Sequence, residues 1–298
     1  MPMNAPKWID VGGIRTRYFE AGRGEPILLL MGCHFGSAEY ACVAQAWQHN
    51  FDELAKGHRV IALDKLGQGF TDNPKNDDYT MQAVVDHGAA FMAALGLAGV
   101  HLVGHSRGAF QATRLTLEYP ERVRSCTIVT SSTLAPGVGT NEVVLTGCPH
   151  PRGSRESQAW NDRAYSYSDA HVTDDYVALG HEVMNLPKYK EAVRKMEDEG
   201  LKLKLFLPAL AKMKQETLGW IADRGMKRPT QVIWACNDKT ATLQRGHALF
   251  QLIAARERRA YFHAINRSGH FVFREQQKQF NEIVTGFLRS LSEQPVKA

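Results

Sequence analysis

The chain has 298 residues, of which 44% are apolar and 22% charged, and its formal net charge is +5. These values are typical of a soluble globular protein with one large domain or two small ones. The longest strongly apolar run, residues 26–31, is far shorter than the about 20 residues of a membrane-spanning helix. The modest charge, without clusters of Lys and Arg among aromatic residues, favours neither nucleic acid nor membrane as a partner.

The N-terminal segment and the cysteines bear on the compartment. Residues 1–9 lack the apolar core and cleavage pattern of a signal peptide, so we expect a cytoplasmic protein. The five cysteines are scattered and form no C-x-x-C pair, so we expect reduced, buried thiols rather than a disulfide framework or a zinc site. The twelve histidines show no metal-binding spacing. We therefore expect no metal and no cofactor.

The first elements predict the edge and centre of a sheet. Residues 7–11 and 14–19 alternate apolar and polar side chains around two glycines and predict a β-hairpin. The apolar runs 27–31 and 58–63 predict buried strands of a parallel sheet covered on both faces. Residues 40–56 between them are long enough for a helix.

The middle of the chain continues the alternation of strand and helix. Thr80 can cap a helix whose apolar positions keep helical spacing up to residue 95. Residues 100–105 predict a strand, 107–118 a helix and 125–130 the next strand. This alternation predicts parallel strands joined by right-handed crossovers.

The alternation stops after residue 130, and the next convincing core strand is 231–235, about a hundred residues later. A crossover needs only one helix, so the surplus indicates an insertion. We expect the core to comprise residues 1–133 and 229–298, and a helical lid to comprise residues 134–228. The expected helices of the lid are 174–184, 188–199 and 201–220. After the lid we expect a helix over 241–255, a strand over 260–265 and an amphipathic terminal helix.

The join between strand 100–105 and helix 107–118 contains Gly104-His105-Ser106-Arg107-Gly108. In a nucleophile elbow, the serine occupies a tight strand-to-helix turn with a strained backbone, and the flanking glycines avoid clashes with neighbouring elements. We therefore predict that Ser106 is the nucleophile. A plain turn is the alternative interpretation, and the flanking strand and helix favour the elbow.

A serine hydroxyl needs a base to take its proton, and the base needs a carboxylate to orient it. Asp238 follows the strand 231–235, and His270 follows the strand 260–265, so both lie where loops leave the sheet. Residues 131–133, after the preceding strand, offer no competing carboxylate. We predict His270 as the general acid and base and Asp238 as its orienting carboxylate. The alternatives are a turn residue at Asp238 and a surface histidine at His270.

Two N–H donors must hold the negative charge that develops on the attacked carbonyl oxygen. The amide of Arg107 at the start of the helix is the first candidate, because the helix dipole adds to it. For the second we favour the amide of Cys33, in the loop 32–36 after the first buried strand. His34 is the near alternative, and a glycine turn without a catalytic role is the third interpretation.

Over nearly its whole length, the chain resembles the α/β-hydrolases, and within them the meta-cleavage-product hydrolases. The residues that carry the resemblance are Gly67-Gln68-Gly69-Phe70-Thr71-Asp72, the elbow around Ser106, Asp238, Gly269-His270-Phe271 and the segment 167–182. The resemblance implies an α/β fold with a mostly parallel eight-stranded sheet, helices on both faces and an inserted helical lid. It also implies a cofactor-independent serine hydrolase that cleaves a C–C bond next to a carbonyl in an aromatic ring-fission product.

The chain departs from this family at four positions. His105 replaces the usual Asn before the nucleophile, Phe271 replaces a Trp, and His181 aligns with the lid Arg that grips the dienoate. Met31 replaces the His of the oxyanion motif. Three of these positions would contact the substrate. A related aromatic ketone or ester is therefore an alternative substrate, with His105 and His181 as hydrogen-bond donors to it. Either histidine could also have a structural role. The expected substrate-binding residues are His34, Phe35, His105, His181 and Phe271.

The leading interpretation is therefore a C–C bond hydrolase that acts on a small aromatic or hydrophobic molecule. A carboxylesterase or lactonase on an aromatic or hydrophobic substrate is the second. A ligand-binding protein of the same fold without catalytic activity is the third, since a fold does not fix a function. A homodimer is the assembly that we consider beside a monomer.

Overall fold

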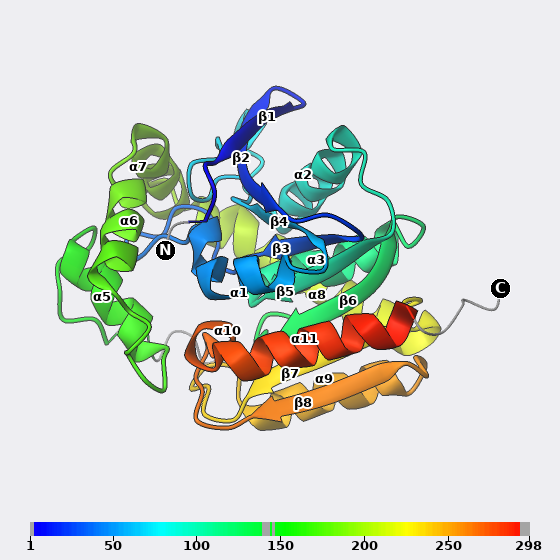
Figure 1. The fold of residues 1–298 in the computed structure, drawn as a ribbon. Coiled ribbons are helices and arrows are strands. Elements are labelled where there is room, and N and C mark those ends of the chain that lie inside the picture. The colour runs from blue at the N-terminus through cyan, green and yellow to red at the C-terminus, as the bar shows by residue number, and fades with distance from the viewer. Residues whose placement is uncertain (1–2, 139–143, 145–146, 293–298) are drawn as a thin grey trace.

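The computed structural model describes residues 3–138, 144 and 147–292. Its centre is an eight-stranded sheet with the order β1-β2-β4-β3-β5-β6-β7-β8 (Figure 1). Strand β2 pairs antiparallel with both β1 and β4, and all other neighbours are parallel. The strands are β1 (Lys7–Val11), β2 (Ile14–Ala21), β3 (Pro26–Leu30), β4 (Arg59–Leu63), β5 (Val100–His105), β6 (Val123–Val129), β7 (Thr230–Ala235) and β8 (Ala260–Ile265). The predicted sheet is confirmed.

Strand β3 illustrates why these runs form the centre of the sheet. Its residues from Ile27 to Leu30 are completely buried. Because successive side chains point to opposite faces, Leu28 and Leu30 join one apolar cluster, whereas Ile27 and Leu29 join another. A strand that is apolar at every position therefore needs helices on both faces of the sheet.

Helices cover both faces of the sheet (Figure 1). Among those that contribute side chains to the cluster of Leu28 are α2 (Met81–Ala94), α3 (Arg107–Glu118), α8 (Leu207–Arg224) and α9 (Leu243–Ala254). Those that contribute to the cluster of Ile27 in the core are α1 (Gln48–Leu54), α10 (Val272–Glu275) and α11 (Gln277–Ser292). The short helices are η1 (Ala44–Trp47), η2 (Lys75–Asp77) and the π-helices η3 (Arg194–Asp198) and η4 (Lys202–Phe206).

Helices α5 (Arg155–Ala164), α6 (Asp174–Met184) and α7 (Pro187–Val193) form a lobe beside the sheet, at the left of Figure 1. They lie between β6 and β7, as does α8. The helix predicted at 174–184 is confirmed, whereas α5 was not predicted. Helix α8 packs into the core through buried Leu210, Met213 and Ile221. We therefore propose that the lid proper ends before α8, and that the last part of the segment 134–228 belongs to the core.

Local signals account for several helix ends. The side chain of Thr80 accepts a hydrogen bond from the amide of Ala83 at 3.1 Å, which is the predicted N-cap. Helix α8 ends at Gly225, whose φ of 69° suits glycine. The helix predicted over residues 40–56 is only partly present: η1 and α1 cover residues 44–54. Residues 40–43 are a loop, because the amide of Ala41 bonds the side chain of Gln158 in α5. Among the described residues, no helix is long and apolar enough to cross a membrane.

Candidate active site

Ser106 lies at the sharp turn between β5 and α3, with φ of 54° and ψ of −123°. Its amide donates to the carbonyl of Val129 at 3.0 Å, which ties the turn to β6. A Cβ atom at Gly104 would lie 2.3 Å from the carbonyl oxygen of Gly108, and one at Gly108 would lie 2.1 Å from that of Leu30. Only glycine fits at either position, so the strained serine is held by close backbone packing on both sides. This is the geometry predicted for an elbow.

Asp238 and His270 are directly bonded in the loops after β7 and β8. The Nδ1 of His270 lies 2.6 Å from Oδ2 of Asp238. The Oδ1 of Asp238 accepts three further hydrogen bonds, from the amide and hydroxyl of Thr240 and from the amide of Ala241. Burial alone would raise the pKa of Asp238, but His270 and these donors outweigh it and hold the pKa below its usual value. The carboxylate is therefore charged and fixed in orientation.

The backbone of His270 is held as firmly as its ring. Its amide donates to the carbonyl of Tyr165 in the lid at 2.8 Å. Its carbonyl accepts from the hydroxyl of Thr130 at 3.0 Å and from Nε2 of His105 at 2.8 Å. Because a carbonyl can only accept, His105 carries its proton on Nε2. Burial, with the neighbouring His270 next in importance, lowers the pKa of His105 well below its ordinary value, so its ring is neutral. His105 is thus a support for His270.

Glu275 connects the lid to the histidine loop, a role that no sequence pattern indicated. Its Oε1 accepts from the amide of Gly269, and its Oε2 accepts from the amides of Tyr167 and Ser168. Burial raises the pKa of Glu275, an effect that the three amide donors oppose. A single carboxylate therefore fixes residues 167–168 beside the loop that carries His270.

Ser106 and His270 line the same small pocket. The other residues that line it are Met31, Cys33, Tyr40, Cys42, His105, Arg107, Tyr165 and Phe271. The space open to the centre of a water molecule is about 20 Å³. Ligand pockets usually measure about 300 to 1,000 Å³, so a substrate must displace covering side chains or lid segments to enter. Among the described residues, no hydrogen bond joins the Ser106 hydroxyl to the imidazole of His270 in this closed arrangement.

The loop after β3 brings its backbone to the pocket. Cys33 has a φ of 66°, and its amide has no acceptor among the residues that the structure describes. The carbonyl of Cys33 accepts from Nζ of Lys65 at 3.1 Å. Arg107 begins α3, where the first amides have no partner within the helix. Both amides proposed for the oxyanion are thus unbonded and belong to residues that line the pocket.

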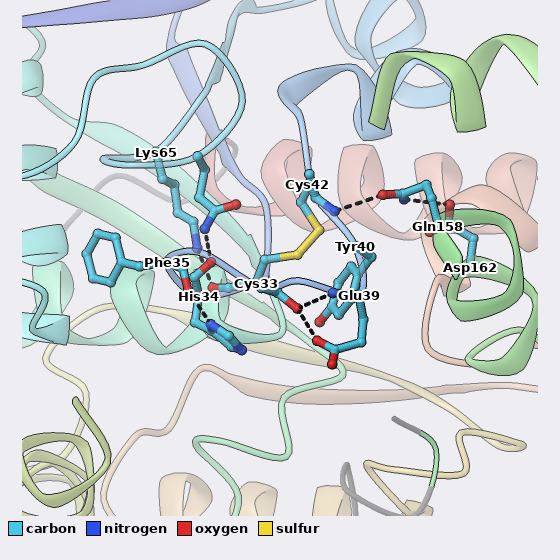
Figure 2. The surroundings of a disulfide bond; sticks show 12 residues. Cys33, His34, Phe35, Glu39, Tyr40, Cys42, Lys65, Gln158 and Asp162 are labelled. Carbon is cyan, nitrogen blue, oxygen red and sulfur yellow. Dashed lines mark hydrogen bonds between the residues drawn. A yellow bond between two sulfur atoms is a disulfide. The ribbon is translucent and has the colours of Figure 1, made fainter. Parts of the chain in front are cut away.

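The expectation of reduced thiols is wrong for two of the five cysteines. Cys33 and Cys42 form a disulfide, with their Cα atoms 6.3 Å apart (Figure 2). The chain turns back after β3, so both residues reach the pocket wall, and a separation of nine residues gives no hint of this fold-back. Cys126, Cys148 and Cys236 are free thiols, as expected, but only Cys126 is buried.

Three of the predicted substrate contacts lie outside the pocket lining. The Nδ1 of His34 donates to the carbonyl of Phe35 at 2.6 Å, and burial lowers the pKa of His34 to about 3. The ring of Phe35 packs in the core against Tyr79, with ring centres 5.2 Å apart. His181 lies partly exposed on α6, where its Nε2 meets the side chain of Asn185 at 3.1 Å. The buried residues of α6 are Tyr176, Val177, Gly180, Val183 and Met184, and His181 is not among them.

The remaining lining residues include several that the sequence did not single out. Tyr40 and Tyr165 come from the loop after β3 and from the lid, and Arg107 is the first residue of α3. No group of three or more His, Cys, Asp or Glu side chains in the described part of the chain could hold a metal ion.

A family model described as the alpha/beta hydrolase fold matches residues 26–276. The chain belongs to the α/β-hydrolase fold family. The 2-hydroxy-6-oxo-2,4-heptadienoate hydrolase of Pseudomonas putida is 27% identical to this α/β-hydrolase over 285 residues, which cover 95% of each chain. The 2-hydroxymuconate semialdehyde hydrolase of Pseudomonas sp. (strain CF600) is 28% identical over 295 residues and 96% of each chain.

Solved structures resemble this α/β-hydrolase over the same length. The meta-cleavage product hydrolase CumD of Pseudomonas fluorescens IP01 superposes with a TM-score of 0.77 at 27% identity, over 95% of this chain and 97% of that one. The predicted resemblance is thus confirmed at the level of the family and its meta-cleavage-product members.

Proposed function

We propose that this α/β-hydrolase cleaves a C–C bond next to a carbonyl in an aromatic ring-fission product, with Ser106, His270 and Asp238 as its triad. The bond between Asp238 and His270, beside Ser106 in a strained elbow, is the observation that carries the proposal. The relatives named above, aligned over almost the whole chain, have names that describe such hydrolases. This combination supports hydrolysis of a diketone by a serine nucleophile.

The hydrogen-bond pattern of His270 suits a general base. With Nδ1 donating to Asp238, the neutral imidazole has its lone pair on Nε2, which can accept the Ser106 proton. The Ser106 oxygen then attacks the carbonyl carbon, and the oxyanion lies between the amides of Arg107 and Cys33. The carboxylate of Asp238 stabilises the imidazolium that forms. Proton transfer requires that Ser106 and His270 come within hydrogen-bond distance when the substrate is bound.

Breaking the C–C bond requires that the leaving carbon carry an electron pair. In a vinylogous 1,5-diketone, ketonisation of the dienol places a second carbonyl where it takes up this pair as a dienolate. His270 donates a proton to the leaving fragment, and an acyl group remains on Ser106. Water, deprotonated by His270, then releases the carboxylic acid, so one water is consumed and a carboxylic acid and a hydroxydienoate are formed.

Ester or lactone hydrolysis is a second candidate that one observation favours. The pocket is lined by His105 and Phe271 where the family usually has Asn and Trp, and His181 lies outside the lining. The usual contacts with a dienoate are therefore altered. The same triad and oxyanion site would hydrolyse an aryl ester without the ketonisation step.

A turnover screen distinguishes these functions. Initial rates are measured with 2-hydroxy-6-oxohepta-2,4-dienoate and with aryl acetates, using wild-type protein and Ser106→Ala as the control. The proposal predicts faster turnover of the ring-fission product and a loss of several orders of magnitude in kcat in Ser106→Ala. Turnover of esters alone would favour the second candidate. No Ser106-dependent turnover of either class would indicate a protein that only binds its ligand.

A further inference from the structure

Arg107 lines the pocket, and its side chain has no carboxylate partner among the described residues. Its Nε is buried and has no hydrogen-bond partner within the part of the chain that the structure describes. Its guanidinium carbon lies 5.8 Å from the ring centre of Phe206. None of the ion pairs formed between described residues includes Arg107, although most buried arginines in this structure are paired, as Arg17 is with Asp64. The residue after the nucleophile therefore carries a positive charge that no carboxylate of the described residues neutralises.

A second basic side chain lies behind the same wall. Lys65 is buried, with 3% of its surface exposed, and its Nζ donates to the carbonyl of Cys33, its one hydrogen-bond partner among the described residues (Figure 2). Burial, and next the charge of Arg107, lower the pKa of Lys65 to about 7. The charge of Arg107 also lowers the pKa of buried His34, after burial itself. These groups surround the Cys33 loop from two elements, the end of β4 and the start of α3.

An unpaired charge in a partly buried position is costly, because it loses hydration without gaining a partner. Such a group is retained where an anion binds. The guanidinium presents N–H donors in a planar fork that matches a carboxylate, and hydrogen bonds between ionised groups are among the strongest in proteins. A free fork next to the nucleophile thus fits a substrate that carries a carboxylate.

We propose that the guanidinium of Arg107 binds a carboxylate of the substrate and makes this chain selective for ring-fission acids over their neutral esters. The proposal rests on the proposed function, since it assigns a substrate class to the same pocket. It gives the anion-binding role to the residue after the nucleophile, because His181 lies on the exposed side of α6. The pocket wall shared by Ser106 and Arg107 places the bound carboxylate on the nucleophile's side of the pocket.

The test compares an acid with its neutral ester in matched variants. KM and kcat are measured for 2-hydroxy-6-oxohepta-2,4-dienoate and for its methyl ester, in wild-type protein, Arg107→Met and Arg258→Met. Arg258 is exposed in the turn before β8, at the end of the sheet opposite the pocket, so its variant removes the same charge elsewhere. Arg107→Met should raise KM for the acid by about 10- to 100-fold, with a much smaller change for the ester. Arg258→Met should leave the acid-to-ester ratio as in wild type.

Two results would overturn the proposal. One is an equal change for acid and ester in Arg107→Met, which would mean that the side chain only shapes the pocket. The other is an unchanged acid-to-ester ratio. Arg107→Lys should recover part of the selectivity, because it restores the charge without the planar fork. If Arg107→Met does not fold, Arg107→Gln serves in its place, with folding checked by thermal denaturation.

A binding measurement separates this inference from the proposed function. The Ser106→Ala variant is titrated calorimetrically with 2-hydroxypenta-2,4-dienoate, the expected product, with and without Arg107→Met. Binding that weakens by about 10-fold or more in the double variant supports the anion site even if wild-type protein turns over no ring-fission acid, in which case only the proposed function fails. Equal binding in both variants overturns the anion site, whatever the turnover.

Discussion

The substitution Asp238→Asn tests how the orientation of His270 is set. Three donors hold the Oδ1 side of Asp238, namely the amide and hydroxyl of Thr240 and the amide of Ala241. An amide side chain has a single oxygen, and these donors would keep it on that side. Its NH2 group would then face Nδ1 of His270, where the carboxylate now accepts a bond at 2.6 Å. Two N–H donors cannot bond, so the imidazole must move its proton to Nε2.

This tautomer cannot accept the proton of Ser106. A wrong tautomer with intact geometry costs about 10,000-fold in kcat, which corresponds to about 5.5 kcal/mol of barrier. The free energy of unfolding should fall far less, by about 1 to 3 kcal/mol, since neutral hydrogen bonds replace those of the carboxylate and the packing stays. Activity and stability should therefore separate clearly in this variant.

The assay need not depend on the natural substrate. The rate at which a fluorophosphonate labels Ser106 reports the nucleophile directly, and kcat with a ring-fission acid or an aryl ester gives a second reading. Asp169→Asn, at an exposed position of the lid, is the matched control and should behave as wild type. Labelling or turnover of Asp238→Asn above about a tenth of the wild-type rate would refute the role that we give to this carboxylate.

Three further predictions follow from other buried groups. Burial raises the pKa of Asp162 from 3.8 to about 6. Between these two pH values the folded protein therefore keeps a proton that the unfolded chain releases. The free energy of unfolding should fall by about 3 kcal/mol as the pH rises from about 4 to above 6. Asp162→Asn should therefore gain melting temperature over wild type at pH 8 and much less at pH 4; an equal gain at both would contradict the assignment. Cys42→Ser should lose about 3 kcal/mol of unfolding free energy relative to the oxidised protein, because the disulfide no longer closes its loop. Wild-type protein in dithiothreitol should match the variant. Identical denaturation midpoints of wild-type protein with and without reductant would speak against the disulfide. Glu275→Ala leaves three amide donors unpaired and should cost about 2 to 3 kcal/mol, with faster proteolysis within residues 165–168; unaltered proteolysis would show that another contact holds this segment.

Much of the fold could be predicted because its signals are local. The completely apolar run of β3 requires a layer of helices on each face of the sheet. The elbow is recognised from five consecutive residues, in which Ser106 has a glycine two positions away on either side. Chain order then limited the acid and the base to the loops after β7 and β8, since the carboxyl ends of parallel strands share one edge of the sheet. Asp238 and His270 are accordingly found bonded to each other.

The features that were missed depend on contacts between distant segments. Cys33 and Cys42 meet because the loop after β3 folds back, and no spacing rule describes that path. Lys65 resembles an ordinary loop lysine until β4 is placed beside the Cys33 carbonyl. His181 was assigned by alignment to a family position, but the burial of one face of α6 turns its ring elsewhere. Tertiary packing determines the contacts of such residues, and the sequence carries no local signal for this packing.

The most direct measurement is an analysis of products formed from 2-hydroxy-6-oxohepta-2,4-dienoate by wild-type protein and by Ser106→Ala at equal concentration. We predict that wild-type protein forms acetate and 2-hydroxypenta-2,4-dienoate in equal amounts, and that Ser106→Ala forms them more slowly by several orders of magnitude. Near-wild-type product formation by Ser106→Ala would contradict the account.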